Sequence, residues 1–420
     1  MAAVIALLTL MVTAAPASAH AALGGSSPGP GTVLSDPPLV VTLTFSEPVE
    51  LAQGAVRVFD DAFAQVDRGR ATSPPGRGDR LQVRLPPSLR RGTYVVVWQV
   101  SSADTHPQAG SFRFSVGSPT RVRGQVPGVG RNDPAGLLLG MLRWVGYAGL
   151  ILGPGLLLAG LLLWPAALAE RRTRRMLWTG LGLLVGSTVV APALQGVWAG
   201  NRSFHTLWIN HGSLDSHSRR FDQVYALRTY LVLAFAGVLA AALRSSMTAG
   251  RRRPVVLIVA GVGLGVTATW PFVGHAAAGS WVPVALILNL LHTAAMALWL
   301  GALVLALVAV VPRSVLPQLS SLSFSAVVVL VLTGTAMSWR EVGSIEAMTT
   351  TTYGRLLMVK LLVVVAVLVL GNMARIAVRR SRPVQALRAG VAAEIGLAVV
   401  ILALTSALVV LMPASQVVGR

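Results

Sequence analysis

Ala17-Ser18-Ala19-His20 is the stretch that divides this chain of 420 residues into its parts. Residues 1–15 before it form an apolar run about as long as the hydrophobic segment of a secretory signal peptide, and too short to span a bilayer comfortably. The small residues Ala17 and Ala19 match the pattern that signal peptidase recognises. We therefore predict that residues 1–19 are a signal peptide and that the mature chain begins at His20.

The sequence after this stretch predicts short β-strands. Apolar and polar residues alternate as in strands with one buried face, whereas a further segment, residues 94–100, is more continuously apolar, as in a central strand. The alternating segments are residues 41–45, 56–58, 81–85 and 112–116. Turn-rich pieces such as Ser73-Pro74-Pro75-Gly76 separate the strands, and no convincing helical pattern occurs among them. We expect residues 20–117 to form a small antiparallel, all-β sandwich of the immunoglobulin-like or cupredoxin-like Greek-key type.

The remaining part of the chain is far more apolar. Hydrophobic residues make up 54% of the sequence and charged residues only 12%, although the first third is polar, and this composition is typical of a membrane protein. A segment rich in Pro, Gly and Arg predicts a linker over residues 118–135, and residues 136–413 predict an all-α polytopic membrane domain of eight helices. The predicted spans are residues 136–164, 176–198, 224–243, 255–273, 284–311, 319–339, 353–376 and 391–411.

The arginines indicate how these spans are oriented. If the N-terminal part is exported, the first span runs from outside to inside, and the loops alternate from there. Fourteen arginines then lie on the inner side: Arg171, Arg172, Arg174, Arg175, Arg244, Arg251, Arg252, Arg253, Arg313, Arg375, Arg379, Arg380, Arg382 and Arg388. Four lie on the outer side: Arg202, Arg219, Arg220 and Arg340. This asymmetry predicts a multi-pass plasma-membrane protein with an extracytoplasmic N-terminal domain, and it explains the net charge of +20 without a nucleic-acid partner.

Three residues of the exported part could bind a metal ion together. An N-terminal His20 offers its α-amine and its ring Nδ1, while Asp104 and His106 follow the strand that holds Trp98 and would add one oxygen and one nitrogen. Three nitrogens and one oxygen suit the equatorial positions of Cu(II). The chain has no cysteine, so thiolate sites are excluded. The alternative is a chance histidine after the signal peptide and an aspartate that caps a turn.

The same residues carry a resemblance to a known family. The segments 20–23, 45–49, 92–98 and 102–107 are similar to the CopC copper-binding family. That resemblance implies Cu(II) bound by His20, Asp104 and His106, with Glu47 near the site as a weaker candidate. Members of the family usually read Asp-Gly-His in the loop, and Thr105 departs from this pattern. Residues 20–118 contain no methionine, so we expect no Cu(I) site of thioethers in this domain.

Polar residues inside the predicted spans are further candidates, because they are costly in lipid. His292 and Met296 are four residues apart and so share a helix face, which could hand on copper. Alternatively, the histidine is hydrogen-bonded to a neighbouring helix and the methionine fills space. His275 lies at the outer mouth of the fourth span, where an entering ion would first meet protein. We expect Met337 to be packing and Lys360 to extend toward the outer face.

The membrane part is similar to a second family. The segment from His292 to Gly301, the Gly274-His275-Ala276 element, and residues 353–360 followed by Gly371-Asn372 resemble the CopD membrane family over roughly residues 136–413. A CopC-like domain ahead of a CopD-like domain is the arrangement of copper-import fusion proteins. This resemblance implies a protein that is no enzyme, captures Cu(II) outside the cell and moves copper inward. Its partners would be the copper ion, the lipid bilayer and extracytoplasmic copper donors.

Three other classes of protein are alternatives to a copper importer. One is a copper tolerance protein that sequesters copper and uses its helices as an anchor. A monooxygenase with an N-terminal histidine chelate is disfavoured, because Asp104 would close the position where oxygen binds. A membrane haem protein is disfavoured too, because His275 is at the edge of its span while His292 is roughly 13 Å deep at 1.5 Å per residue.

Overall fold

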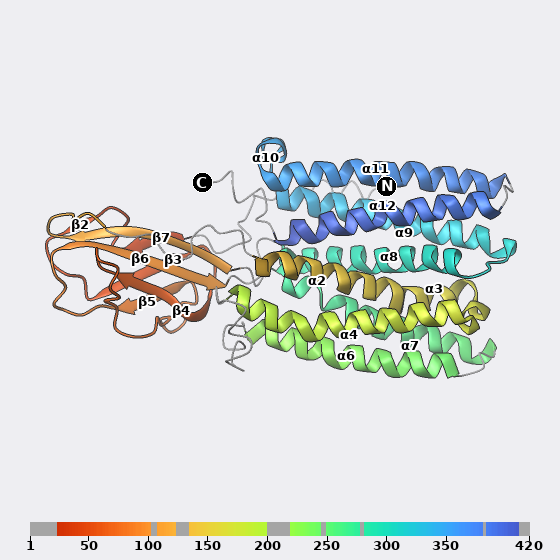
Figure 1. Ribbon diagram of the computed structural model, residues 1–420, viewed down its shortest axis with the longest axis horizontal. Coiled ribbons are helices and arrows are strands. Elements are labelled where there is room, and N and C mark those ends of the chain that lie inside the picture. Colours follow the sequence, from red (N-terminus) through yellow and green to blue (C-terminus); the bar gives the residue numbers. More distant parts are fainter. Residues whose placement is uncertain are drawn as a thin grey trace.

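The computed structural model describes residues 23–101, 107–122, 134–199, 219–244, 249–277, 281–380 and 384–410. Figure 1 shows a β-sandwich built by the first part of the chain and a bundle of long helices built by the rest. The predicted signal peptide, His20 and most of the predicted linker lie outside the described residues.

Two sheets make up the sandwich. The strands are β1 (Leu23–Ser27), β2 (Val33–Leu34), β3 (Val40–Phe45), β4 (Glu50–Phe59), β5 (Arg80–Arg84), β6 (Gly92–Ser101) and β7 (Pro107–Val116). A sheet in the order β1-β3-β5 faces a sheet in the order β2-β7-β6-β4. All five predicted strand segments are confirmed. The short strands β1 and β2 were not predicted, and β2 runs parallel to β7, whereas an antiparallel arrangement was expected.

Alternation along the strands produces the core. Val41 and Leu43 of β3 and Leu81 and Val83 of β5 are fully buried between the sheets, as a side-chain period of two requires. Phe45 packs against Trp98 of β6 edge to face, with ring centroids 5.3 Å apart. Such a pair contributes about 0.5–1.5 kcal/mol beyond its buried area, so it fixes one end of the sandwich.

Gly110 of β7 leaves room for the Trp98 ring. The two residues are paired across β6 and β7, and a Cβ on Gly110 would lie 2.5 Å from Cζ2 of the ring. We expect Gly110→Ala to lower the free energy of unfolding of the sandwich by about 1–3 kcal/mol, because the ring must move within a packed core. Chemical denaturation followed by tryptophan fluorescence measures this. Gly25→Ala is the matched control, since its added Cβ meets nothing within 4 Å, and an equal loss in both variants would contradict the prediction.

The beginning of the predicted linker is held by the sandwich. Thr120 and Thr93 exchange three hydrogen bonds: Thr93 N donates to Thr120 Oγ1 at 2.9 Å, Thr93 Oγ1 donates to the Thr120 carbonyl at 3.0 Å, and Thr120 N donates to Thr93 Oγ1 at 2.9 Å. The chain is therefore tied to the first residues of β6 before it runs on toward the membrane part.

The membrane part consists of eight helices long and apolar enough to cross a bilayer, within the described ranges, as predicted. The first span is formed by α2 (Pro134–Leu150), the π-helical turn η1 (Ile151–Gly155) and α3 (Leu156–Leu163). The others are α4 (Arg171–Ala199), α6 (Arg219–Arg244), α7 (Ala249–Ala268), α8 (Val282–Val308), α9 (Leu316–Val342), α11 (Thr352–Arg379) and α12 (Val384–Val410). The short helix α10 (Ile345–Thr350) connects α9 and α11.

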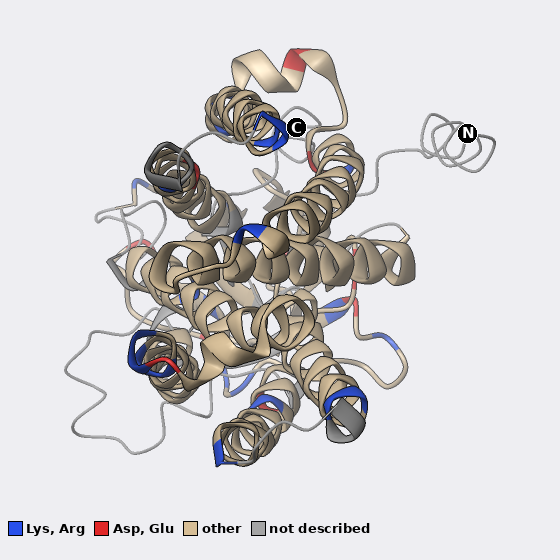
Figure 2. Cartoon of the chain, turned by 90° about the vertical axis from the view of Figure 1, so that its right-hand side faces the viewer, with Lys and Arg blue, Asp and Glu red and all other residues tan. Residues whose placement is uncertain are grey.

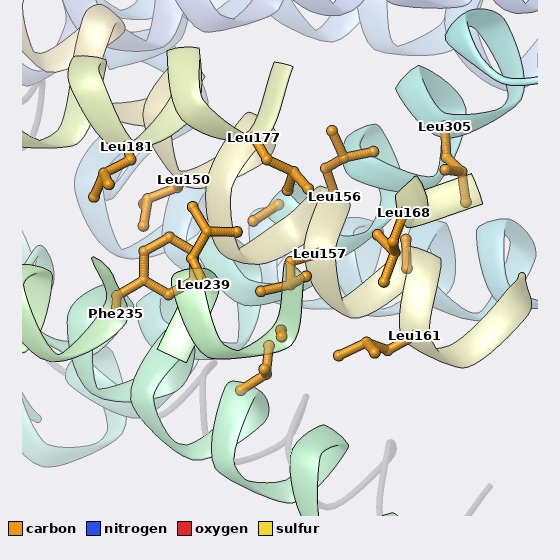
Figure 3. Close-up of a cluster of buried hydrophobic side chains, with 14 of the residues drawn as sticks. Leu150, Leu156, Leu157, Leu161, Leu168, Leu177, Leu181, Phe235, Leu239 and Leu305 are labelled. Carbon is orange, nitrogen blue, oxygen red and sulfur yellow. The ribbon is translucent and has the colours of Figure 1, made fainter. Parts of the chain in front are cut away.

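The first span lies at the centre of one half of the bundle. Leu156 and Leu157 are fully buried, together with Leu177 of α4 and Phe235 of α6 (Figure 3). On its other side the π-helical turn crosses α8 at glycines. A Cβ on Gly155 would collide with the carbonyl of Ala297, and one on Gly301 would collide with the backbone of Gly155. Small residues at such crossings let membrane helices approach closely, and here they fix the position of α8.

Candidate functional site

The predicted ligands of the exported domain, His20, Asp104 and His106, lie outside the described residues. The strand pairings nevertheless locate the residues next to them. Leu23 pairs with Phe45, the last residue of β3, and Glu50, the first residue of β4, pairs with Ser101. Ser101 in turn pairs with Pro107, the first residue of β7.

These strand ends share one end of the sandwich, because only residues 46–49 separate β3 from β4. Glu47 belongs to that connection, and its Oε1 atom is shielded from solvent. The described neighbours of all three predicted ligands, and the weaker candidate Glu47, therefore lie at the same end of the two sheets.

A cavity of about 430 Å³ lies between the helices of the membrane part. Its lining comes from α2, α8, α9, α11 and α12, and from the segment between α7 and α8. His292 and Met296, the candidates predicted from their spacing, both line it. Met337 of α9, which was expected to be packing, lines the same cavity.

His292 is oriented by a hydrogen bond to α9. Its Nδ1 atom lies 2.9 Å from Oγ1 of Thr333, and that hydroxyl donates its own proton to the carbonyl of Val329 at 2.6 Å. A hydroxyl has one proton, so Thr333 must accept from Nδ1–H. The imidazole then carries its proton on Nδ1 and keeps the lone pair on Nε2, which is the arrangement in which a neutral histidine binds a metal ion. The sequence left two roles open for His292, a hydrogen bond to a neighbouring helix or a bond to a metal ion. The hydrogen bond is present, and it still allows His292 to bind a metal ion through Nε2.

The lining of this cavity includes soft thioether ligands, from Met296 and Met337, and a borderline imidazole ligand, from His292. Among the described residues no group of three His, Asp or Glu could hold a metal ion, so His292 would be joined by the thioethers of Met296 and Met337. Thioether and imidazole ligands suit copper, and thioethers favour Cu(I) over harder cations.

Charged side chains border the cavity. Arg340 is paired with Glu341 at 2.8 Å, and Arg143 of α2 donates from Nη2 to the carbonyl of Val273 at 2.7 Å. Lys360, expected to extend toward the outer face, lines the cavity with His292. A positive charge there disfavours cations in general, so a bound copper ion would have to be held by coordination bonds rather than by the local field.

The segment between α7 and α8 contributes to the lining of the cavity. Arg228 of α6 donates from Nε and Nη2 to Oγ1 and to the carbonyl of Thr269, at 2.8 and 3.0 Å, and its guanidinium lies over the ring of Trp270. Gly274 and Ala276 line the cavity, so the backbone of His275 lies beside it, although its side chain is outside the description.

Two functional candidates were missed at the sequence level. Thr333 is 41 residues from His292 and on another helix, so no local pattern connects them. Glu394 of α12 is only 4% exposed, and it is the single acidic residue between Arg388 and Leu408. A search for lone acids inside apolar spans would have found it.

The fold and the site together define a class: a multi-pass membrane protein that joins a β-sandwich to a helical bundle with a cavity lined by His292, Met296 and Met337. Residues 23–117 match the family model described as the CopC domain, and residues 313–408 match the model described as copper resistance protein D, CopD. The chain therefore carries a CopC domain followed by a CopD domain, the order expected from the sequence. The CopD match covers α9 to α12, a narrower range than the residues 136–413 that we expected.

Individual proteins are similar to the whole chain or to its first part. Copper transport protein CutJ of Bacillus subtilis strain 168 is 25% identical over 403 residues, which cover 90% of this chain and 72% of that protein. Protein YobA of Escherichia coli strain K12 is 31% identical over 112 residues, 27% of this chain and 90% of that protein. The crystal structure of CopC from Methylosinus trichosporium OB3b covers 26% of this chain and 100% of its own, with 26% identity and a TM-score of 0.22. The family matches point to copper handling rather than to an enzyme.

Proposed function

We propose that this protein captures Cu(II) outside the cell with its sandwich and transports copper inward through the helical cavity. The observation that carries the proposal is the geometry of His292: Nδ1 is committed to Thr333, Nε2 is left for a metal ion, and the cavity also receives Met296 and Met337. The similarity to a copper transport protein over 90% of the chain supports copper as the substrate.

Capture is assigned to His20, Asp104 and His106. Its support is the pairing of Leu23, Phe45, Ser101 and Pro107, which brings the described neighbours of all three ligands to one end of the sandwich. An imidazole with an α-amine, a carboxylate and a second imidazole form a ligand set for Cu(II). Extracytoplasmic copper donors would deliver the ion to this end.

The orientation rests on the distribution of charge. Figure 2 views the bundle from the end far from the sandwich and shows Lys and Arg residues, coloured blue, at several helix ends there. Arg171 begins α4, Arg244 ends α6 and Arg379 ends α11, all on the side predicted to be cytoplasmic. Because positive residues are retained in the cytoplasm, the sandwich is assigned to the outside of the plasma membrane.

His292→Ala tests the transport role in cells that lack the chromosomal gene. We expect expression-dependent copper accumulation to fall at least about 10-fold, since even residues that only support a metal ligand contribute 10–100-fold to metal affinity. Cellular copper is measured by mass spectrometry. Leu291→Ala, at a neighbouring and exposed position of α8, is the control that should retain uptake.

Two outcomes would speak against this function. If the His292→Ala variant accumulates as much copper as the wild type, the cavity is not part of the transport path. Higher cytosolic copper in cells without the gene would favour the alternative, a tolerance protein that sequesters copper.

A further inference from the structure

A second cavity, of about 260 Å³, lies between α8, α9, α11 and α12, farther along the same helices than the His292 cavity. It is lined by the C-terminal half of α8, the N-terminal half of α9, the C-terminal half of α11 and the beginning of α12. Polar groups in its lining include Ser320 and Ser323 of α9, Asn372 of α11 and Glu394 of α12. It is thus at the arginine-rich side of the protein, whereas the lining of the His292 cavity includes Gly274 and Ala276 near the other ends of the helices. We call the two the inner and the outer cavity.

The two cavities share part of their lining, and the shared side chains are apolar. The side chains that line both of them are Trp299, Val327, Val367 and Leu368. Trp299 and Val367 are only 6% and 5% exposed and belong to the same buried cluster. An ion that moves from one cavity to the other passes these four side chains, which will be called the Trp299 layer.

Glu394 stands on the inner side of the layer without a partner among the described residues. Both arginines of the inner cavity are engaged elsewhere. The Arg375 guanidinium lies 4.2 Å from the centroid of the Phe324 ring, and Arg388 Nη2 donates to the carbonyls of Leu307 and Ala309 at 3.1 and 3.4 Å. Gly371 faces the carboxyl group, and a Cβ built on it would lie 3.8 Å from Oε2.

A lone carboxylate in this position is costly, because charged side chains inside a membrane require a partner. The group is therefore expected to hold a proton while the cavity contains no cation, and to give it up when a cation arrives. A carboxylate binds Cu(I), the ion that thioethers favour, less well than imidazole and thioethers do. Transport requires sites weak enough to release the ion, so a carboxylate on the inner side suits the last position on an inward path.

We propose that Glu394 is the inner binding site for the transported copper ion, which passes the Trp299 layer from the His292 cavity. Copper replaces the carboxyl proton, the proton leaves through the inner cavity, and a proton returns to Glu394 when copper is released to the cytoplasm. In this exchange at Glu394 no electron is transferred, and no net proton crosses the membrane. This inference rests on the proposed function, since it takes copper as the ion that reaches the inner cavity.

The surroundings limit which groups could produce a pH dependence. In the described lining of the inner cavity, α11 contributes Arg375 and α12 contributes Arg388, while α8 and α9 contribute apolar side chains and serines. From α2, which also packs on α12, the titratable residues Arg143 and Tyr147 line the outer cavity. Glu394 is the acid in this lining.

The test is uptake of radioactive copper by proteoliposomes that contain the full chain, with copper supplied outside with and without ascorbate. We expect Glu394→Gln to slow uptake at least about 10-fold, comparable to the loss of a group that supports a metal site. Wild-type uptake should slow as the internal pH is lowered, because protons compete with copper, and the residual uptake of the variant should not change with internal pH. Glu394→Asp should keep the pH dependence, and Glu346→Gln, at an exposed acid of α10, should behave as wild type.

The variants separate the inference from the proposed function. If His292→Ala abolishes uptake while Glu394→Gln retains the wild-type rate and pH dependence, the inner site is wrong and the transport role stands. If His292→Ala transports normally, the proposed function itself is wrong. A melting curve of each purified variant shows whether it is folded, and a folded Glu394→Asp variant that has lost its pH dependence would also contradict the inner site.

Discussion

A detached sandwich that begins at His20 and carries His106→Ala is expected to bind Cu(II) at least about 100-fold more weakly than the unsubstituted domain. The substitution removes one of the proposed nitrogen ligands directly, and this should exceed the 10–100-fold effect of residues that only support a ligand. The domain should be folded without copper, because Val41, Leu43, Leu81 and Phe114 give it a buried core of its own. Competitive titration against a chelator of known affinity measures the change.

An extension of the same domain by one residue before His20 should weaken Cu(II) binding to a similar extent. The peptide bond turns the α-amine into an amide and so removes a second nitrogen ligand. Spin resonance should show fewer nitrogen couplings in both variants. Asp36→Asn, at an exposed acid, is the control, and unchanged affinity in the extended domain would show that the N-terminus is no ligand.

The variant Gly301→Leu should lose copper transport completely and lower the stability of the helical bundle by about 3 kcal/mol or more. Its side chain would have to occupy the backbone position of Gly155, and a backbone cannot move aside as a flexible side chain can. The crossing with the first span holds α8 in its position. Because α8 carries His292, Met296 and Trp299, moving it away from the first span disturbs both cavities. Transport is measured as cellular copper, and stability as the melting temperature in detergent.

Gly182→Leu is the matched control for that substitution. Gly182 lies in the middle of α4, is exposed, and meets nothing within 4 Å of an added Cβ. A leucine there adds the same volume to a membrane helix and should leave transport and melting temperature close to wild type. Equal losses in the two variants would mean that any large residue in a span is harmful, and that the crossing is not special.

Much of the sandwich was predictable because its strands are half buried. Alternation of apolar residues identified the segments around Leu43, Val58, Leu81, Val96 and Phe114, and each is a strand. The strand Leu23–Ser27 contains two glycines and little apolar surface, and Val33–Leu34 is too short for any pattern. Their pairing with β3 and β7 depends on partners far along the chain, so local sequence could not show it.

The outer cavity was predictable in part. The spacing of His292 and Met296 placed both on one face of α8, and they do line one cavity. The role of Thr333, the presence of Met337 in the same lining and the isolation of Glu394 depend on how α9, α11 and α12 pack. These features come from contacts between helices, and hydropathy along one helix does not contain them.

The sequence by itself determined the order of a strand-rich part and eight apolar spans, because alternation and span length follow directly from which side chains avoid water and lipid. It also predicted the side of the membrane on which each loop lies, through the positions of the arginines. Only the tertiary structure decided which nitrogen of His292 is committed to Thr333, and that two cavities share the apolar side chains of the Trp299 layer. Hydrogen bonds and cavities between helices arise from the packing of residues far apart in the chain, where no sequence period applies.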